Sequence, residues 1–156
     1  MKKSAAVKQL ELDLLDESIR QHPAMAETFP RSYFVKPKRD DTTANGLTRC
    51  IIDFIRLHGG QAERISITGR AHEVRNSAGR IVDVKWTKSH MTIGTADISA
   101  TIGGRSVKIE VKVGRDRQSN AQREYQRQVE AAGGLYFIAR TFEGFVQWYN
   151  ELWQTK

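Results

Sequence analysis

Hydrophobic side chains recur every three to four residues in three segments, a spacing typical of helices that bury one face. The first segment, ANGLTRCIIDFIRLHGG at 44–60, ends in a double glycine that predicts a helix stop. The second, SNAQREYQRQVEAAGG at 119–134, begins with Ser119 and has Gln122 three positions later, as in a capping box. The third, EGFVQWYNELWQ at 143–154, predicts a closing amphipathic helix.

Alternating hydrophobic and polar residues, typical of strands with one buried face, lie between these helices. Three short pieces, AERISIT, RAHEVRN and RIVDVKW, fall within residues 62–86 and are separated by Gly69 and by the sequence SAG. They predict a meander of neighbouring strands. LYFIAR at 135–140 predicts one more buried strand, so the predicted order is helix, several strands, helix, strand and helix.

The stretch GTADISATIGGRSVKIEVK, residues 94–112, has the alternation of a β-hairpin. Gly103 and Gly104 suit a two-residue loop, because both central positions of such a loop need positive φ. Ile102 then faces Arg105, and counting outward puts Asp97 opposite Glu110. Facing residues share one side of a sheet, with Cβ atoms about 4.5–5.5 Å apart, so two carboxylates are expected close together. The other side of the hairpin is apolar: Ile98, Ala100, Ile102, Val107, Ile109, Val111 and Val113.

Two facing carboxylates repel each other unless a positive charge lies between them. A divalent cation with a preference for oxygen supplies that charge, and Mg²⁺ held by Asp97, Glu110 and the backbone carbonyl of Val111 would retain waters. One such water, its pKa lowered by the metal, would be a nucleophile, while Lys112 orients it or neutralises a phosphate. The alternative is a pair of solvated acids on an exposed face, shielded by Lys108 and Lys112.

Residues 1–43 differ in character from the rest of the chain. The stretch VKQLELDLLDESIRQ has a pattern compatible with a helix, but the residues after it hold all three prolines and little periodicity. We therefore expect residues 1–43 to form an N-terminal arm or extension, and residues 44–156 to form one domain. Lys36, Lys38 and Arg39 at the basic tip of the arm are candidate nucleic-acid contacts.

Composition and charge narrow the function classes. The 156 residues carry a formal net charge of +7, and the pI of about 9.8 favours a polyanionic partner. The single cysteine, Cys50, excludes an intramolecular disulfide and argues against a zinc finger. No apolar run approaches the roughly 20 residues of a membrane span, and the first residues lack the apolar core of a secretory signal. We expect a cytosolic protein without membrane contact.

Three motifs resemble those of a known superfamily. Gly94-Thr95-Ala96-Asp97, then Glu110-Val111-Lys112, then Ser119 with Gln122 are similar to the motifs of PD-(D/E)XK nucleases, and within them to the VRR-NUC group with its phage and prophage members. The similarity extends over roughly residues 43–153. It implies an α/β fold with a restriction-endonuclease-like core, in which a central mixed β-sheet is flanked by helices. It also implies a Mg²⁺-dependent DNA endonuclease, with Mn²⁺ as a substitute, in the cytoplasm of a bacterial or phage-infected cell.

The resemblance assigns roles by position. Asp97 and Glu110 correspond to the metal-binding acids of the superfamily, and Lys112 corresponds to its catalytic lysine. Gln122 resembles a glutamine that lies near the metal and the scissile phosphate in this branch, and it equally suits the capping box. Ala96 departs from the proline that commonly precedes the first acid, a change that affects backbone rigidity more than chemistry.

Further residues and alternative functions stay open at this point. The superfamily often adds an acid from the first helix or its neighbourhood, and Asp53 and Glu63 are both candidates. Arg115 and Arg117 follow Lys112 and are the nearest candidates for contacts with a DNA backbone. By analogy, a homodimer would act on duplex or branched DNA. The alternatives are a catalytically inactive DNA-binding module on a nuclease fold, and a small interaction protein whose basic charge confers solubility.

Overall fold

Four strands form a mixed central sheet in the computed structural model, which describes residues 3–65, 70–87 and 92–153. Their order is β1 (Gln61–Arg64), β4 (Ile98–Ile102), β5 (Arg105–Val111) and β6 (Leu135–Ala139). The first three run antiparallel to their neighbours, and β6 pairs with β5 in parallel. The predicted mixed sheet is therefore confirmed.

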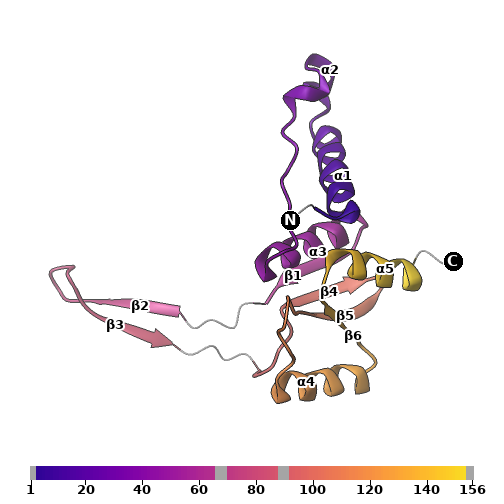
Figure 1. Cartoon of the computed structure of the whole chain (residues 1–156). Helices are drawn as coiled ribbons and strands as arrows, with labels where there is room; N and C mark the ends of the chain where they lie inside the picture. The colour runs from indigo at the N-terminus through magenta and orange to yellow at the C-terminus, as the bar shows by residue number, and fades with distance from the viewer. Residues whose placement is uncertain (1–2, 66–69, 88–91, 154–156) are drawn as a thin grey trace.

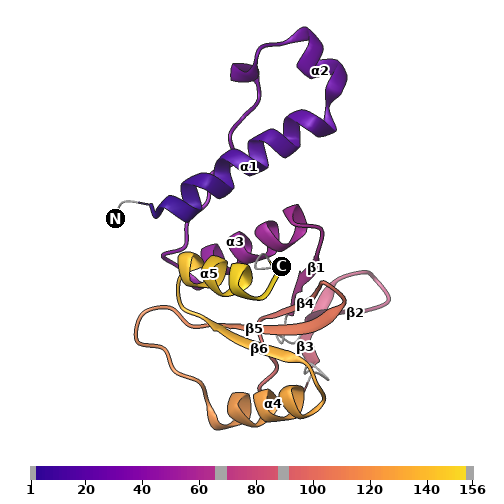
Figure 2. The same cartoon turned by 90° about the vertical axis from the view of Figure 1, so that its right-hand side faces the viewer.

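Helices cover both faces of this sheet. The helices α3 (Ala44–Leu57) and α5 (Phe142–Trp153) lie on one side, and α4 (Asn120–Ala131) lies on the other (Figure 2). These are the three helices that the hydrophobic spacing predicts. Within the described residues, no helix combines the length and the apolar character that a membrane span requires.

The hydrophobic core lies between the sheet and the layer of α3 and α5. Its largest fully buried apolar side chains are Leu10, Leu47, Ile51, Ile55, Ile98, Ile109, Phe142 and Phe145. Fully burying one such side chain contributes about 1.5–3 kcal/mol. The acid Glu110 is 1% exposed, as deeply buried as these residues.

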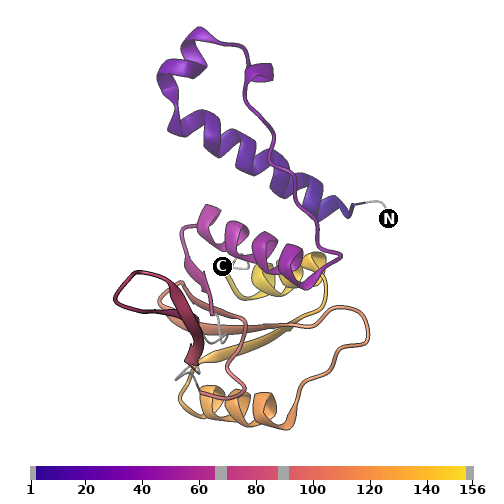
Figure 3. The same ribbon diagram turned by 90° about the vertical axis from the view of Figure 1, so that its left-hand side faces the viewer.

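The N-terminal helix α1 (Ala5–Gln21) contributes to the same core. Val7 and Leu10 are 0% and 1% exposed and belong to one cluster with residues of α3, β5 and α5. Part of the expected N-terminal arm therefore packs into the core formed by the later residues. The far part of α1 extends away from the sheet together with α2 (Pro23–Thr28) and the 3₁₀ turn η1 (Arg31–Tyr33), neither of which has a buried residue (Figure 3).

The β4–β5 hairpin has the predicted register. Ile102 faces Arg105, and the pairing continues outward to Ile98 facing Ile109. Gly103 and Gly104 form the loop with φ of 55° and 78°, the left-handed conformation that two-residue hairpin loops need. One face of the hairpin carries buried apolar residues, and the other carries polar residues beneath α4.

The predicted meander is wrong in one respect. Among the described strands, β2 (Arg70–Arg75) and β3 (Ile81–Thr87) pair only with each other and form a second sheet, which projects from the core (Figure 1). β1 pairs with β4 instead of β2, because this pairing sets Ala62 against Ala100 and completes the buried face of the central sheet. Residues 66–68 of the predicted strand AERISIT lie outside the described residues.

Candidate active site

Asp97 lies one residue before β4 and is fixed by two hydrogen bonds, one to the residue that follows β1 and one to the last residue of β5. Its backbone carbonyl accepts the N–H of Ile65 at 2.8 Å, and its carboxylate Oδ2 accepts the N–H of Val111 at 2.8 Å. The β4–β5 pairing ends at Ile98 and Ile109, so a regular ladder would continue by setting Val111 opposite Ala96. Instead, the Asp97 carboxylate accepts the backbone N–H of Val111, and this hydrogen bond holds the acid beside the end of β5.

Glu110 is the most buried acid of the site, at 1% exposure. Its Oε1 accepts hydrogen bonds from the Lys112 ammonium at 3.0 Å and from the Gln122 side-chain amide, and its Oε2 accepts the Tyr136 hydroxyl at 3.4 Å. Burial raises the pKa of Glu110, the negative charge of Asp97 raises it further, and Lys112 opposes both effects. The ionised form of Glu110 therefore needs positive charge nearby to be stable.

Lys112 supplies one positive charge at this position. Its side chain is 8% exposed, and its ammonium lies 3.0 Å from Glu110 Oε1 and 3.2 Å from Asp116 Oδ2. Burial alone would lower the pKa of Lys112, but its hydrogen bond to Glu110 and the charges of Glu110 and Asp116 raise it. The backbone N–H of Lys112 donates to the Ala139 carbonyl at 2.9 Å, which extends the β5–β6 ladder.

Gln122 connects α4 to this site. Its Oε1 accepts the Ser119 N–H at 2.9 Å and its own N–H donates to Ser119 Oγ at 3.2 Å, so the predicted capping box is confirmed. The side-chain amide nitrogen meanwhile donates to Glu110. Gln122 is therefore a capping partner of Ser119 that also contacts Glu110.

The donor atoms at this end of β5 suit a hard cation. Because the N–H and C=O of one strand residue point toward the same neighbouring strand, the Val111 carbonyl lies on the Asp97 side of β5. Two carboxylates and a carbonyl are the oxygen donors that Mg²⁺ prefers, with waters for the remaining positions. Across the described parts of the chain, no group of three or more His, Cys, Asp or Glu side chains is arranged to hold a metal ion.

The two candidates for a further acid lie in different places. Glu63 faces Ser99, and Ser99 faces Lys108, which is two residues before Glu110, so Glu63 lies on the polar face of the sheet. Asp53 belongs to α3 in the layer over the opposite face, where its Oδ2 accepts Arg39 Nε at 2.6 Å. Of the two, Glu63 shares the face of Glu110.

The predicted nucleic-acid contacts also divide into two groups. Arg115 and Arg117 are exposed in the loop between Lys112 and α4, and Lys38 is exposed in the arm. Lys36 and Arg39 have partners inside the protein: Lys36 lies 3.4 Å from Glu11, which is 3% exposed, and Arg39 pairs with Asp53. These two residues hold the arm against α1 and α3.

Sequence reasoning missed two residues of the site. Tyr136 is the second residue of β6, and the parallel register sets it beside Lys108 on the polar face, from which its hydroxyl reaches Glu110. Burial and the nearby Glu110 charge raise the pKa of Tyr136. Asp116 lies four residues after Lys112 and binds its ammonium, a spacing that could have signalled the ion pair.

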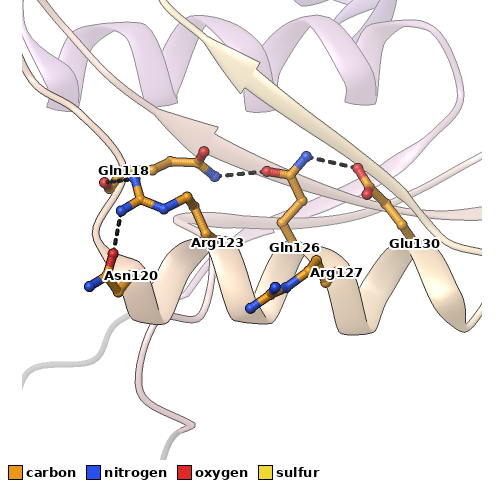
Figure 4. A pocket seen from close by; sticks show the side chains of 6 residues that line it. All are labelled: Gln118, Asn120, Arg123, Gln126, Arg127 and Glu130. Carbon is orange, nitrogen blue, oxygen red and sulfur yellow. Dashed lines mark hydrogen bonds between the residues drawn. The ribbon is translucent and has the colours of Figure 1, made fainter.

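A shallow hollow of about 400 Å³ runs along α4 (Figure 4). Its lining residues are Gln118, Asn120, Arg123, Gln126, Arg127 and Glu130. Gln126 accepts from Gln118 at 2.9 Å and donates to Glu130 at 2.8 Å, and Arg123 donates to the Gln118 carbonyl. The polar groups of the hollow thus largely bind one another.

Comparisons with known proteins add no family to this description. A scan against protein-family models gives no match, and a search of curated proteins finds no significant match either. The similarity of Asp97, Glu110, Lys112 and Gln122 to nuclease motifs therefore depends on these residues and on their geometry alone.

Proposed function

We propose that the protein is a metal-dependent endonuclease of the PD-(D/E)XK type, similar to VRR-NUC nucleases, that hydrolyses phosphodiester bonds in DNA. The observation that carries the proposal is the cluster of Asp97, Glu110, Lys112 and Gln122 at one end of β5, with Glu110 contacted by both Lys112 and Gln122. The formal charge of +7 is consistent with a polyanionic substrate. A homodimer acting on two strands in a bacterial or phage-infected cell belongs to the same proposal.

Asp97, Glu110 and the Val111 carbonyl would hold Mg²⁺ or Mn²⁺. The cation would supply Lewis-acid activation of the phosphodiester and of water. Gln122 and Tyr136 each bind one Glu110 oxygen, which fixes the plane of that carboxylate. Such orientation keeps the acid in one geometry as substrate binds.

Lys112 is the residue suited to contact the phosphate. Its ammonium has a second acceptor in Asp116, so it remains oriented at the site independently of Glu110. A positive charge in a largely buried position stabilises negative charge that develops on a phosphate far better than an exposed lysine does. Lys112 would therefore neutralise that charge or orient the attacking water.

One observation favours the second candidate, a nuclease-fold module that binds DNA without cutting it. Glu110 is engaged by Lys112, Gln122 and Tyr136, and among the described residues no group of three or more His, Cys, Asp or Glu side chains could hold a metal ion. In this alternative the Lys112 ammonium is the permanent counter-charge of Glu110. Binding without hydrolysis would then be the only activity.

Cleavage assays separate the two functions. The protein is incubated with labelled linear, single-stranded and four-way-junction DNA in Mg²⁺, Mn²⁺ or EDTA, beside Asp97→Asn, Glu110→Gln and the control Glu143→Gln, which removes an exposed acid of α5. Cleavage that needs metal, is lost in both site variants and persists in the control supports the nuclease. Tight binding without cleavage in either metal supports the inactive module. Unchanged cleavage by Glu110→Gln would show that the site is elsewhere.

A further inference from the structure

The β2–β3 hairpin pairs with no other strand that the structure describes. Among the described elements, β2 and β3 pair only with each other, and the hairpin projects from the core (Figure 1). From His72 to Lys85 every described side chain is exposed except Val74, which is half-buried. A two-stranded hairpin is at best marginally stable alone in water. A binding partner would stabilise it.

Both ends of the hairpin connect to the candidate active site. Residue 65 immediately precedes the linking residues, and its N–H donates to the Asp97 carbonyl at 2.8 Å. The chain returns through Thr92, whose carbonyl accepts the N–H of Thr95 two residues before Asp97. Five peptide steps separate Ile65 from Arg70, which span at most about 18 Å. Any molecule that occupies the site therefore lies within reach of the hairpin.

The hairpin surface combines positive charge with β-branched side chains. Residues 70–87 contain four arginines and lysines against two acids, and Arg75 is paired with Glu73 at 2.6 Å. Within the part of the chain that the structure describes, Arg80 and Lys85 have no ion-pair partner. Ile81, Val82 and Val84 are 50%, 60% and 51% exposed.

We propose that the β2–β3 hairpin binds duplex DNA by entering its major groove beside the candidate active site. The major groove admits a two-stranded β-ribbon, in which cationic side chains contact phosphates and apolar ones contact thymine methyl groups. Arg80 and Lys85 are the phosphate contacts, and the exposed valines face the base edges. The inference rests on the proposed function, because it takes DNA as the partner, but it concerns binding and not hydrolysis.

Binding measured in EDTA tests the hairpin without any need for cleavage. The double variant Arg80→Ala/Lys85→Ala is compared with Lys8→Ala/Arg20→Ala, which removes two exposed cations of α1. Fluorescence anisotropy with a 30-base-pair duplex and with its single strand is recorded over a range of salt concentrations. Losing two phosphate contacts should reduce the slope of log K against log salt by about 1.8 for duplex, in the hairpin variant only. Affinity for the single strand should stay unchanged.

Further readouts define what would overturn the proposal. Bound protein should protect guanine N7, a major-groove atom, from methylation, and Arg80→Ala/Lys85→Ala should lose that protection. An unchanged salt slope, or an equal loss in the α1 control, would contradict it. The variant Val82→Thr/Val84→Thr tests a second copy of the chain as the partner. If sedimentation shows that this variant is a monomer where the wild type is a dimer, and its DNA affinity is unchanged, the hairpin binds a second copy instead of DNA. A wild type that binds duplex but cleaves nothing with metal would refute the proposed nuclease and leave the hairpin proposal standing.

Discussion

Gly94 controls how closely α4 approaches the loop that precedes Asp97. It has a φ of +85°, and a Cβ built on it would lie 2.4 Å from the backbone carbonyl of Ala121 and 2.8 Å from the backbone nitrogen of Gln122. Gly94→Ala therefore combines two costs: about 1–2 kcal/mol for an L-residue in the left-handed region, and about 1–3 kcal/mol for overpacking. The total should be about 2–5 kcal/mol, a large part of a typical domain stability.

The matched control is Gly133→Ala at the other end of α4. Gly133 has a similar φ of +82°, but nothing lies within 4 Å of the Cβ position, so only the conformational cost applies. Urea unfolding followed by tryptophan fluorescence should show Gly94→Ala losing about 1–3 kcal/mol more than Gly133→Ala. Equal free-energy losses would refute the argument that the first turn of α4 packs against Gly94. Any cleavage activity should also fall more in Gly94→Ala, because Gln122 would shift away from Glu110.

Three further outcomes follow from burial and ion pairing. Leu10→Ala should lower the free energy of unfolding by about 2–5 kcal/mol because Leu10 is 1% exposed, while Leu12→Ala at 41% exposure should cost much less; similar losses would contradict the packing of α1. Burial raises the pKa of Cys50 to about 11, so iodoacetamide at pH 8 should label this thiol only after unfolding, and rapid labelling of the native protein would contradict its burial. Arg39→Met should lower stability by about 1.5–3 kcal/mol in thermal melts and leave DNA affinity unchanged, because Arg39 is paired with Asp53; weaker DNA binding would identify it as a contact.

Features set by local sequence were predictable. The loop geometry of Gly103 and Gly104 determines the β4–β5 register, because two adjacent residues with positive φ favour a two-residue hairpin loop. The capping box of Ser119 and Gln122 depends on three-residue spacing and marks the start of α4. These short-range constraints also brought Asp97 next to the end of β5, although the direct facing of Asp97 and Glu110 lies one position beyond the last paired residues.

Features set by distant contacts were not predictable from the pattern. β1 pairs with β4 although residues 65–97 lie between them in the chain, and local alternation contains no information about which strand a residue pairs with. Tyr136 reaches Glu110 only because β6 lies parallel to β5, a register that α4 and its connections determine. Likewise, the backbone N–H of Arg39 donates a hydrogen bond to the Glu11 carboxylate, 28 residues earlier in the chain. The sequence around Arg39 shows only a cluster of basic residues.

Single-turnover cleavage of DNA by Lys112→Met, compared with Lys108→Met, tests the central claim most directly. Lys108 lies in β5 and Lys112 directly follows this strand. The Lys112 ammonium lies 3.0 Å from Glu110, whereas the Lys108 ammonium donates to Ser99 at 2.6 Å. In Mg²⁺ the cleavage rate should fall at least about 100-fold in Lys112→Met, whereas Lys108→Met should cleave at nearly the wild-type rate and both variants should keep the wild-type DNA affinity. Equal rates for the two variants would contradict the assignment of Asp97, Glu110 and Lys112 as a nuclease site.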